Sequence, residues 1–104
     1  MEESGVRLSD VDPQALAFVV QQSKRAGNDA FREKRLSDAI KWYSQAIAGD
    51  ETDHTLFSNR SACYLAEGRF EDALVDAMAA LKLKEQWPKG YYRAGLALMG
   101  QGRF

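Results

Sequence analysis

The chain has 104 residues, of which 45% are hydrophobic and 28% are charged, with a formal net charge of -1. This length predicts one domain with its own core, and the hydrophobic share excludes a wholly disordered chain. The balanced charge argues against a nucleic-acid binder or a membrane-surface binder that works through bulk charge.

The cysteine count and the apolar runs indicate the cellular compartment of the domain. The single cysteine, Cys63, excludes an internal disulfide and a multi-cysteine zinc site, and it suits a reducing compartment. The longest apolar run near the N-terminus, residues 15–20, is too short for a signal peptide or a membrane span. We therefore expect a cytoplasmic domain.

Taken in chain order, the residues predict helices alone. Residues 1–11 are polar and are expected to form a flexible tail, which ends where Asp12 and Pro13 supply an N-cap and a first helical residue. The chain beyond is rich in Ala and Leu and lacks strand-like alternation. The expected helices cover about Pro13–Lys34, Leu36–Ala48, His54–Glu67, Phe70–Lys84 and Pro88–Gln101.

A shift of the sequence by 34 residues aligns residues of the same kind. Small residues coincide at Gly27, Ser61 and Gly95, and Ala39 coincides with Ala73. Small side chains at these points would let paired helices approach closely. The wider gaps are expected to be filled by Phe31, Tyr43, Phe57, Tyr64 and Tyr91.

This period and these residue types resemble the tetratricopeptide repeat, a helix–turn–helix unit of 34 residues. The resemblance implies an all-α helical solenoid of about two and a half repeats, built from antiparallel helices. Residues 12–104 would form the domain, with repeats at about 20–53 and 54–87 and a partial repeat at 88–104. Glu51 and Glu85 stand where the family usually has proline, so we expect those turns to be slightly looser.

Three stretches carry a narrower resemblance, to the carboxylate-clamp subclass of these repeats. They are Lys24-x-x-Gly-Asn28, Ser58-Asn59-Arg60 and Lys89-x-x-x-Arg93. The resemblance implies that Lys24, Asn28 and Asn59 hold the terminal carboxylate of a peptide, and that Lys89 and Arg93 hold a neighbouring carboxylate or carbonyl. The implied partners are the C-terminal Glu-Glu-Val-Asp tails of the seventy- and ninety-kilodalton heat-shock chaperones. Residues expected to select upstream positions of the peptide are Ala62, Ala66 and Leu96.

The chemistry of these five residues agrees with an anionic ligand. Lys24 and Asn28 are four residues apart, as are Lys89 and Arg93, so each pair shares a helix face. Each cation taken singly is typical of a solvated surface, but asparagine inside a helix needs a reason. Arg60 belongs to the same stretch as Asn59, but a structural ion pair with a nearby acid is the better interpretation.

No other residues suggest catalysis, a cofactor or a metal. His54 is expected to face solvent at a helix start, and Cys63 to act as a small buried hydrophobe. Trp42 and Trp87 would serve packing or the rim of a groove. The sequence thus predicts a non-enzymatic adaptor that binds protein partners and neither nucleic acid nor membrane. Two alternatives stay open: a general scaffold for a partner helix or acidic segment, and the recruiting domain of a larger enzyme.

The C-terminal edge carries a further expectation. Phe104 aligns with Leu36 and Phe70, which open the second helix of each full repeat. The third first-type helix would then have one apolar flank without a partner, at Tyr91, Leu98 and Met99. We expect a fragment of a longer protein, which frays after about Gly95 or self-associates through that flank.

Overall fold

The computed structural model describes residues 12–102, and within them the secondary structure is helical throughout, with no strand. The helices are α1 (Pro13–Arg32), α2 (Leu36–Gly49), α3 (His54–Ala66), α4 (Phe70–Leu83) and α5 (Pro88–Gly100). Every helix begins where the sequence predicted, and the helix ends differ by one or two residues. The predicted tail, residues 1–11, and Phe104 lie outside the described residues.

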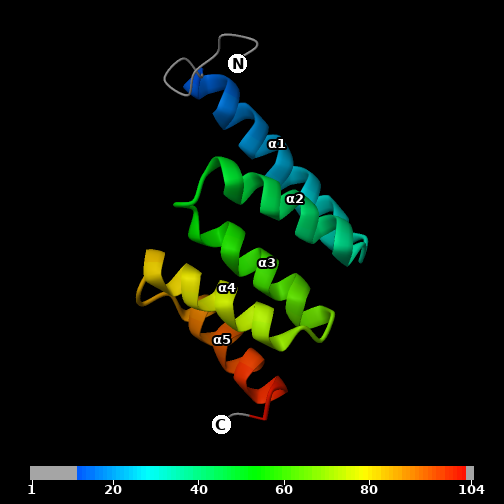
Figure 1. The fold of residues 1–104 in the computed structure, drawn as a ribbon, viewed down its shortest axis with the longest axis vertical. Helices are drawn as coiled ribbons and strands as arrows, with labels where there is room; N and C mark the ends of the chain where they lie inside the picture. Colours follow the sequence, from blue (N-terminus) through cyan, green and yellow to red (C-terminus); the bar gives the residue numbers. More distant parts are fainter. Residues whose placement is uncertain (1–11, 103–104) are drawn as a thin grey trace, which may run out of the picture.

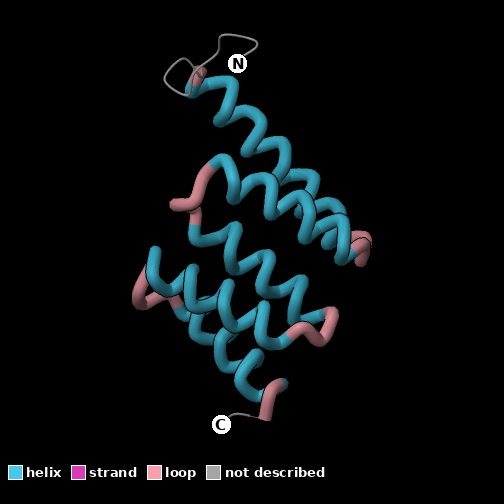
Figure 2. Tube along the Cα trace, in the orientation of Figure 1, coloured by secondary structure: helices cyan, strands magenta, loops and turns pink. Residues whose placement is uncertain are grey.

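The helices stack as successive antiparallel hairpins along the long axis of the molecule (Figures 1 and 2). Helix α1 pairs with α2 and α3 with α4, while α2 also packs on α3 and α5 packs on both α3 and α4. Each helix therefore packs on the next one in the chain, which is the arrangement expected of a repeat solenoid.

Helix starts follow from local hydrogen bonds. The Asp12 carboxylate accepts a bond from the backbone N–H of Gln14 at 2.9 Å, and Pro13 occupies the first turn of α1. Asp53 caps α3 in the same way by accepting from the Thr55 N–H at 2.9 Å. Such caps satisfy backbone donors that have no partner inside the helix.

The turns that follow α1, α3 and α5 share one backbone conformation. Lys34, Gly68 and Gly102 have φ values of 62°, 74° and 73°, in the left-handed region that favours glycine. In the first two turns the next backbone N–H, that of Arg35 or Arg69, donates back across the turn at 2.8 Å. Lys34 adopts this conformation without the freedom of glycine, so the first turn carries some backbone strain.

Small residues allow close approach in both full hairpins, as predicted. A Cβ atom added at Gly27 would lie 2.7 Å from the Tyr43 ring, so α1 and α2 can meet only because that atom is absent. Ser61 is fully buried and donates from Oγ to the Ala73 carbonyl at 2.7 Å. At Gly95 the close approach is not seen, because no atom of the described residues lies within 4 Å of a Cβ placed there.

Of the five aromatic residues predicted to fill gaps between helices, three are buried or half-buried. Tyr43 is 1% exposed, and Phe57 and Tyr64 are half-buried, as expected. The prediction was wrong for Phe31 and Tyr91, which are 39% and 59% exposed. Phe31 lies in the last turn of α1, where Ala30 is the residue that faces the core.

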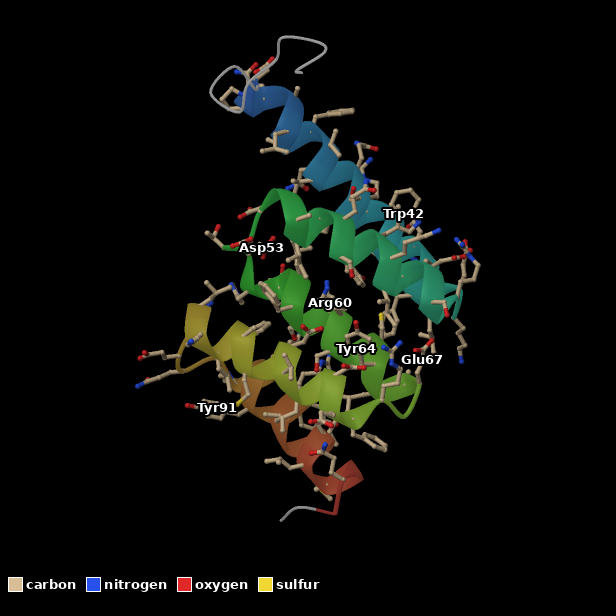
Figure 3. All side chains as sticks on the ribbon, viewed as in Figure 1. Trp42, Asp53, Arg60, Tyr64, Glu67 and Tyr91 are labelled. Carbon is tan, nitrogen blue, oxygen red and sulfur yellow. The ribbon has the colours of Figure 1, made fainter. Side chains whose placement is uncertain are left out.

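The apolar flank expected on α5 is exposed only in part. Tyr91, labelled in Figure 3, and Met99 are exposed, while Leu98 is half-buried. Helix α4 borders this flank, because Met78 and Leu81 of α4 line one hollow together with Tyr91 and Leu98. Fraying and self-association through the flank stay predictions.

Candidate functional site

The predicted clamp residues lie on three helices that are neighbours in space. Lys24 and Asn28 are one turn apart on α1, Asn59 lies on α3, and Lys89 and Arg93 are one turn apart on α5. Helix α1 meets the start of α3 through the Lys24 side chain, and α3 packs directly on α5. The five residues therefore belong to the odd-numbered helices α1, α3 and α5, which are labelled in Figure 1.

Most of these side chains are half-buried, and several have unused donors. Lys89 is exposed, whereas the other four are intermediate. The Arg93 Nε atom is buried and has no hydrogen-bond partner within residues 12–102. A buried N–H without a partner is costly, so a site that supplies an acceptor to Arg93 would be favoured.

A hydrogen bond from a tyrosine side chain orients the Asn28 amide. The Tyr43 hydroxyl donates to Asn28 Oδ1 at 2.5 Å. Burial raises the pKa of Tyr43 to about 12, so this phenol keeps its proton at neutral pH. Because the hydroxyl proton occupies the amide oxygen, the Asn28 NH₂ group is left as the free donor.

Lys24 is held by two residues at the start of α3. Its Nζ atom donates to Asp53 Oδ2 at 3.1 Å and to Thr55 Oγ1 at 3.0 Å. Partial burial acts to raise the pKa of Asp53, but hydrogen bonds from Thr55 and Lys24 outweigh it and lower that pKa. Sequence reasoning missed Asp53, because it assigned no role to the residue that caps α3.

Arg60 forms the structural ion pair that the sequence predicted. Its Nε and Nη2 atoms donate to the two oxygens of Asp76 at 2.7 and 2.8 Å, and Nη1 donates to Ser44 Oγ at 2.9 Å. The guanidinium also lies 5.9 Å from the ring centroids of Phe57 and Tyr64. Figure 3 shows Arg60 on α3, between α2 and α4. The side chain thus joins three helices, and three of its five N–H donors are used in these bonds.

The remaining candidates divide between confirmation and correction. Cys63 is fully buried, and this burial raises the pKa of its thiol to about 12, which confirms an inert packing residue. His54 does not simply face solvent: it is half-buried and packs edge-on against Trp87, with ring centroids 4.5 Å apart. Trp87 is therefore a packing residue, because it stands at the start of α5 and reaches the start of α3. Trp42 is 37% exposed on α2.

The three residues expected to select upstream peptide positions differ in accessibility. Ala62 is buried at 9% exposure, Ala66 is exposed, and Leu96 is half-buried. Ala66 and Leu96 thus have apolar surface that a ligand could touch, whereas Ala62 has little.

Two further properties concern the described part of the chain. Residues 12–102 contain no cluster of His, Cys, Asp and Glu side chains that could hold a metal ion. None of the described helices is long and apolar enough to cross a membrane.

With this geometry in place, comparison with known proteins identifies the family. A family model described as "Serine/threonine-protein kinase BSK1-like, TPR repeats" matches residues 14–94. The chain belongs to the tetratricopeptide-repeat (TPR) family. The resemblance seen in the 34-residue period is thereby confirmed.

Among curated relatives, this TPR domain is similar to the heat shock protein sti1 homolog of Schizosaccharomyces pombe. The two are 46% identical over 84 residues, which are 81% of this chain and 14% of the relative. The chain thus spans about a seventh of that protein's length.

Two solved TPR structures are similar to this chain along most of its length. The second TPR domain of human RPAP3, in complex with the HSP70 peptide SGPTIEEVD, has a TM-score of 0.79 and 30% identity, covering 88% of this chain and 74% of its own. The second TPR of Spaghetti (RPAP3), bound to the HSP90 peptide SRMEEVD, has a TM-score of 0.80 and 29% identity, covering 86% and 85%.

Proposed function

We propose that this TPR domain is a non-enzymatic, cytoplasmic adaptor that binds the acidic C-terminal tails of Hsp70 and Hsp90 chaperones. The observation that supports the proposal is the placement of the five predicted clamp residues on helices α1, α3 and α5: Lys24, Asn28, Asn59, Lys89 and Arg93. The peptides in the two RPAP3 structures end in Glu-Val-Asp, and the sti1 relative is a heat shock protein, which supports the same reading.

The residues suit a terminal aspartate, which presents its main-chain and side-chain carboxylates within one residue. Charge-assisted hydrogen bonds to such groups contribute roughly 1.5–3 kcal/mol each before desolvation is deducted. The Asn28 and Asn59 amides donate without adding repulsion among the cations. Arg93 can grip a carboxylate or a carbonyl with a planar fork, whereas Lys89 acts as a point charge.

Upstream positions of the peptide would contact apolar surface beside the clamp. Ala66 and Leu96 are the accessible candidates for this selection, with Ala62 contributing little surface. These contacts would decide between chaperone tails, since the terminal residues of the two tails are shared.

A second candidate function is recruitment within a larger enzyme. The matching family model is described by a serine/threonine-protein kinase, so TPR repeats of this kind occur beside catalytic domains. Tail binding would then bring a chaperone to the enzyme, with the same clamp residues in use. A general scaffold differs from both, because it would accept an internal acidic segment.

Calorimetric titration with a peptide ending in Glu-Glu-Val-Asp tests the proposal. We expect Lys89→Ala, Arg93→Ala and Asn28→Ala each to lower the affinity by about tenfold or more, since one charged hydrogen bond near 1.4 kcal/mol gives that factor. Lys41→Ala, which removes an exposed lysine from α2, is the matched control and should leave the affinity unchanged.

The form of the peptide separates the proposal from the scaffold alternative. An amidated peptide lacks the terminal charge and should bind far more weakly than the free acid. Equal affinity for the two peptides, or unchanged affinity in all three clamp variants that remain helical, would refute the clamp.

A further inference from the structure

Lys24 differs from the other two cations of the clamp because it already has an anionic partner. Its Nζ atom donates to Asp53 Oδ2 and to Thr55 Oγ1, and the Thr55 hydroxyl in turn donates to Asp53 Oδ1 at 2.6 Å. Two of the three ammonium donors are thus in use, and one is left for a ligand. Lys89 and Arg93 have no ion-pair partner within the described residues.

The pair changes the charge that a ligand meets along the groove. At the α5 end Lys89 and Arg93 offer two positive charges, whereas at the α1 end Lys24 and Asp53 cancel. A carboxylate bound to Lys24 Nζ would lie at most about 6 Å from Asp53 Oδ2, because two bonds of about 3 Å meet at one nitrogen. That separation is shorter than the screening length at physiological salt, so the two carboxylates repel each other.

The ion pair could also favour ligand binding, because it holds the Lys24 side chain in place. We expect this effect to be smaller than the repulsion between the two carboxylates. The side chains of Lys24 and Asp53 are 27% and 24% exposed, and ion pairs with this access to water hold a lysine only weakly. A ligand would therefore gain little from the restrained ammonium, while the Asp53 carboxylate offsets the positive charge of Lys24 that would attract it.

We propose that Asp53 is a specificity-determining residue of the groove: an internal carboxylate that competes with the ligand's terminal carboxylate for Lys24 and limits the affinity for acidic tails. This inference rests on the proposed function. It also predicts that the α5 end, where no such competitor stands, contributes the larger share of the binding energy.

The test is Asp53→Asn, which removes the charge and keeps the cap, since asparagine and aspartate cap helices equally well. We expect the affinity for the free-acid peptide to rise about three- to tenfold, with a smaller gain for the amidated peptide. The gain should shrink as salt is added. Glu51→Gln, which removes an exposed charge from the same loop, is the matched control and should change the affinity by less than twofold.

Thr55→Val separates competition from structural support. A purely supporting role for the pair predicts that Asp53→Asn and Thr55→Val both weaken binding, because each releases Lys24. Competition predicts a gain for Asp53→Asn and at most a small loss for Thr55→Val. Circular dichroism melting checks that both variants fold.

The outcomes distinguish this inference from the proposed function. Tail binding by the parent with no gain, or a loss, in Asp53→Asn overturns the role of Asp53 and leaves the clamp intact. Absence of tail binding in both the parent and Asp53→Asn overturns the clamp and this inference together. Binding that emerges only in Asp53→Asn supports competition in its strongest form.

Discussion

The hydrogen bond from Tyr43 to Asn28 leads to a prediction about the clamp that does not involve charge. Tyr43→Phe removes one oxygen atom and keeps the ring that packs on Gly27. A neutral hydrogen bond of this kind contributes about 0.5–1.5 kcal/mol to stability, so we expect a loss in that range by urea unfolding. We expect the same variant to weaken peptide binding.

The effect on affinity follows from the orientation of the Asn28 amide. In the parent, Oδ1 accepts from Tyr43 and the NH₂ group is directed away as a donor. In Tyr43→Phe both amide orientations become accessible, together with other side-chain rotamers, so only a fraction of molecules presents the donor. The apparent Kd rises in inverse proportion to that fraction, which gives about a two- to fivefold loss of affinity.

A double-mutant cycle with Asn28→Ala makes the reasoning refutable. If Tyr43 acts through Asn28, then Tyr43→Phe costs no further affinity once Asn28 is alanine. Tyr64→Phe removes a hydroxyl from α3 and serves as the control, with affinity expected to stay within twofold. A loss of the same size with and without Asn28, measured by calorimetry, would show that the hydroxyl acts on binding by another route.

Three further predictions concern stability. Gly27→Ala should destabilise the fold by about 1–2 kcal/mol in urea unfolding, because the new Cβ would lie 2.7 Å from the Tyr43 ring. Gly95→Ala has open space around the new Cβ and should stabilise the fold by up to about 1 kcal/mol. Equal effects of the two substitutions would refute the packing argument. Lys34→Gly should stabilise by about 0.5–1 kcal/mol, since φ at this residue is 62°, and a loss of stability would show that the turn is unstrained. Burial raises the pKa of Cys63 from 9.0 to about 12, so the stability gained by keeping the thiol protonated is complete below about pH 9 and is lost as the pH rises towards 12. Unfolding free energies at pH 8 and pH 11 should therefore differ less for Cys63→Ala than for the parent, and an equal drop would contradict this assignment.

Local signals in the sequence were sufficient to predict the helices. Pro13 and Pro88 mark helix starts because their fixed φ suits the first turn. The recurrence of small residues every 34 positions predicted the hairpin contacts at Gly27 and Ser61, because close helix approach requires small side chains there. The clamp positions were named from the resemblance to the carboxylate-clamp subclass, and four-residue spacing adds only that the residues of each pair share a helix face.

Contacts between separate helices were beyond such reasoning. Asp53 meets Lys24 although 29 residues separate them, and this depends on how α1 crosses the start of α3. The stacking of His54 on Trp87 depends in the same way on the turn between α4 and α5. Periodicity predicts the face of a helix on which a residue lies, but it does not predict which side chain of another helix contacts that face.

The arrangement around Arg60 has a consequence for how the solenoid unfolds. Repeat proteins behave as a row of units whose cooperativity is set by the energy of each junction. Here a single guanidinium bonds to Ser44 in the first hairpin and to Asp76, which is 4% exposed, in the second. Only the bond to Ser44 crosses the junction between the hairpins, whereas the two bonds to Asp76 lie within the second hairpin and hold α3 to α4. Opening of the first hairpin would break that one bond and leave Asp76 paired with Arg60, so we expect α3 and α4 to stay together as a unit when α1 and α2 separate from them.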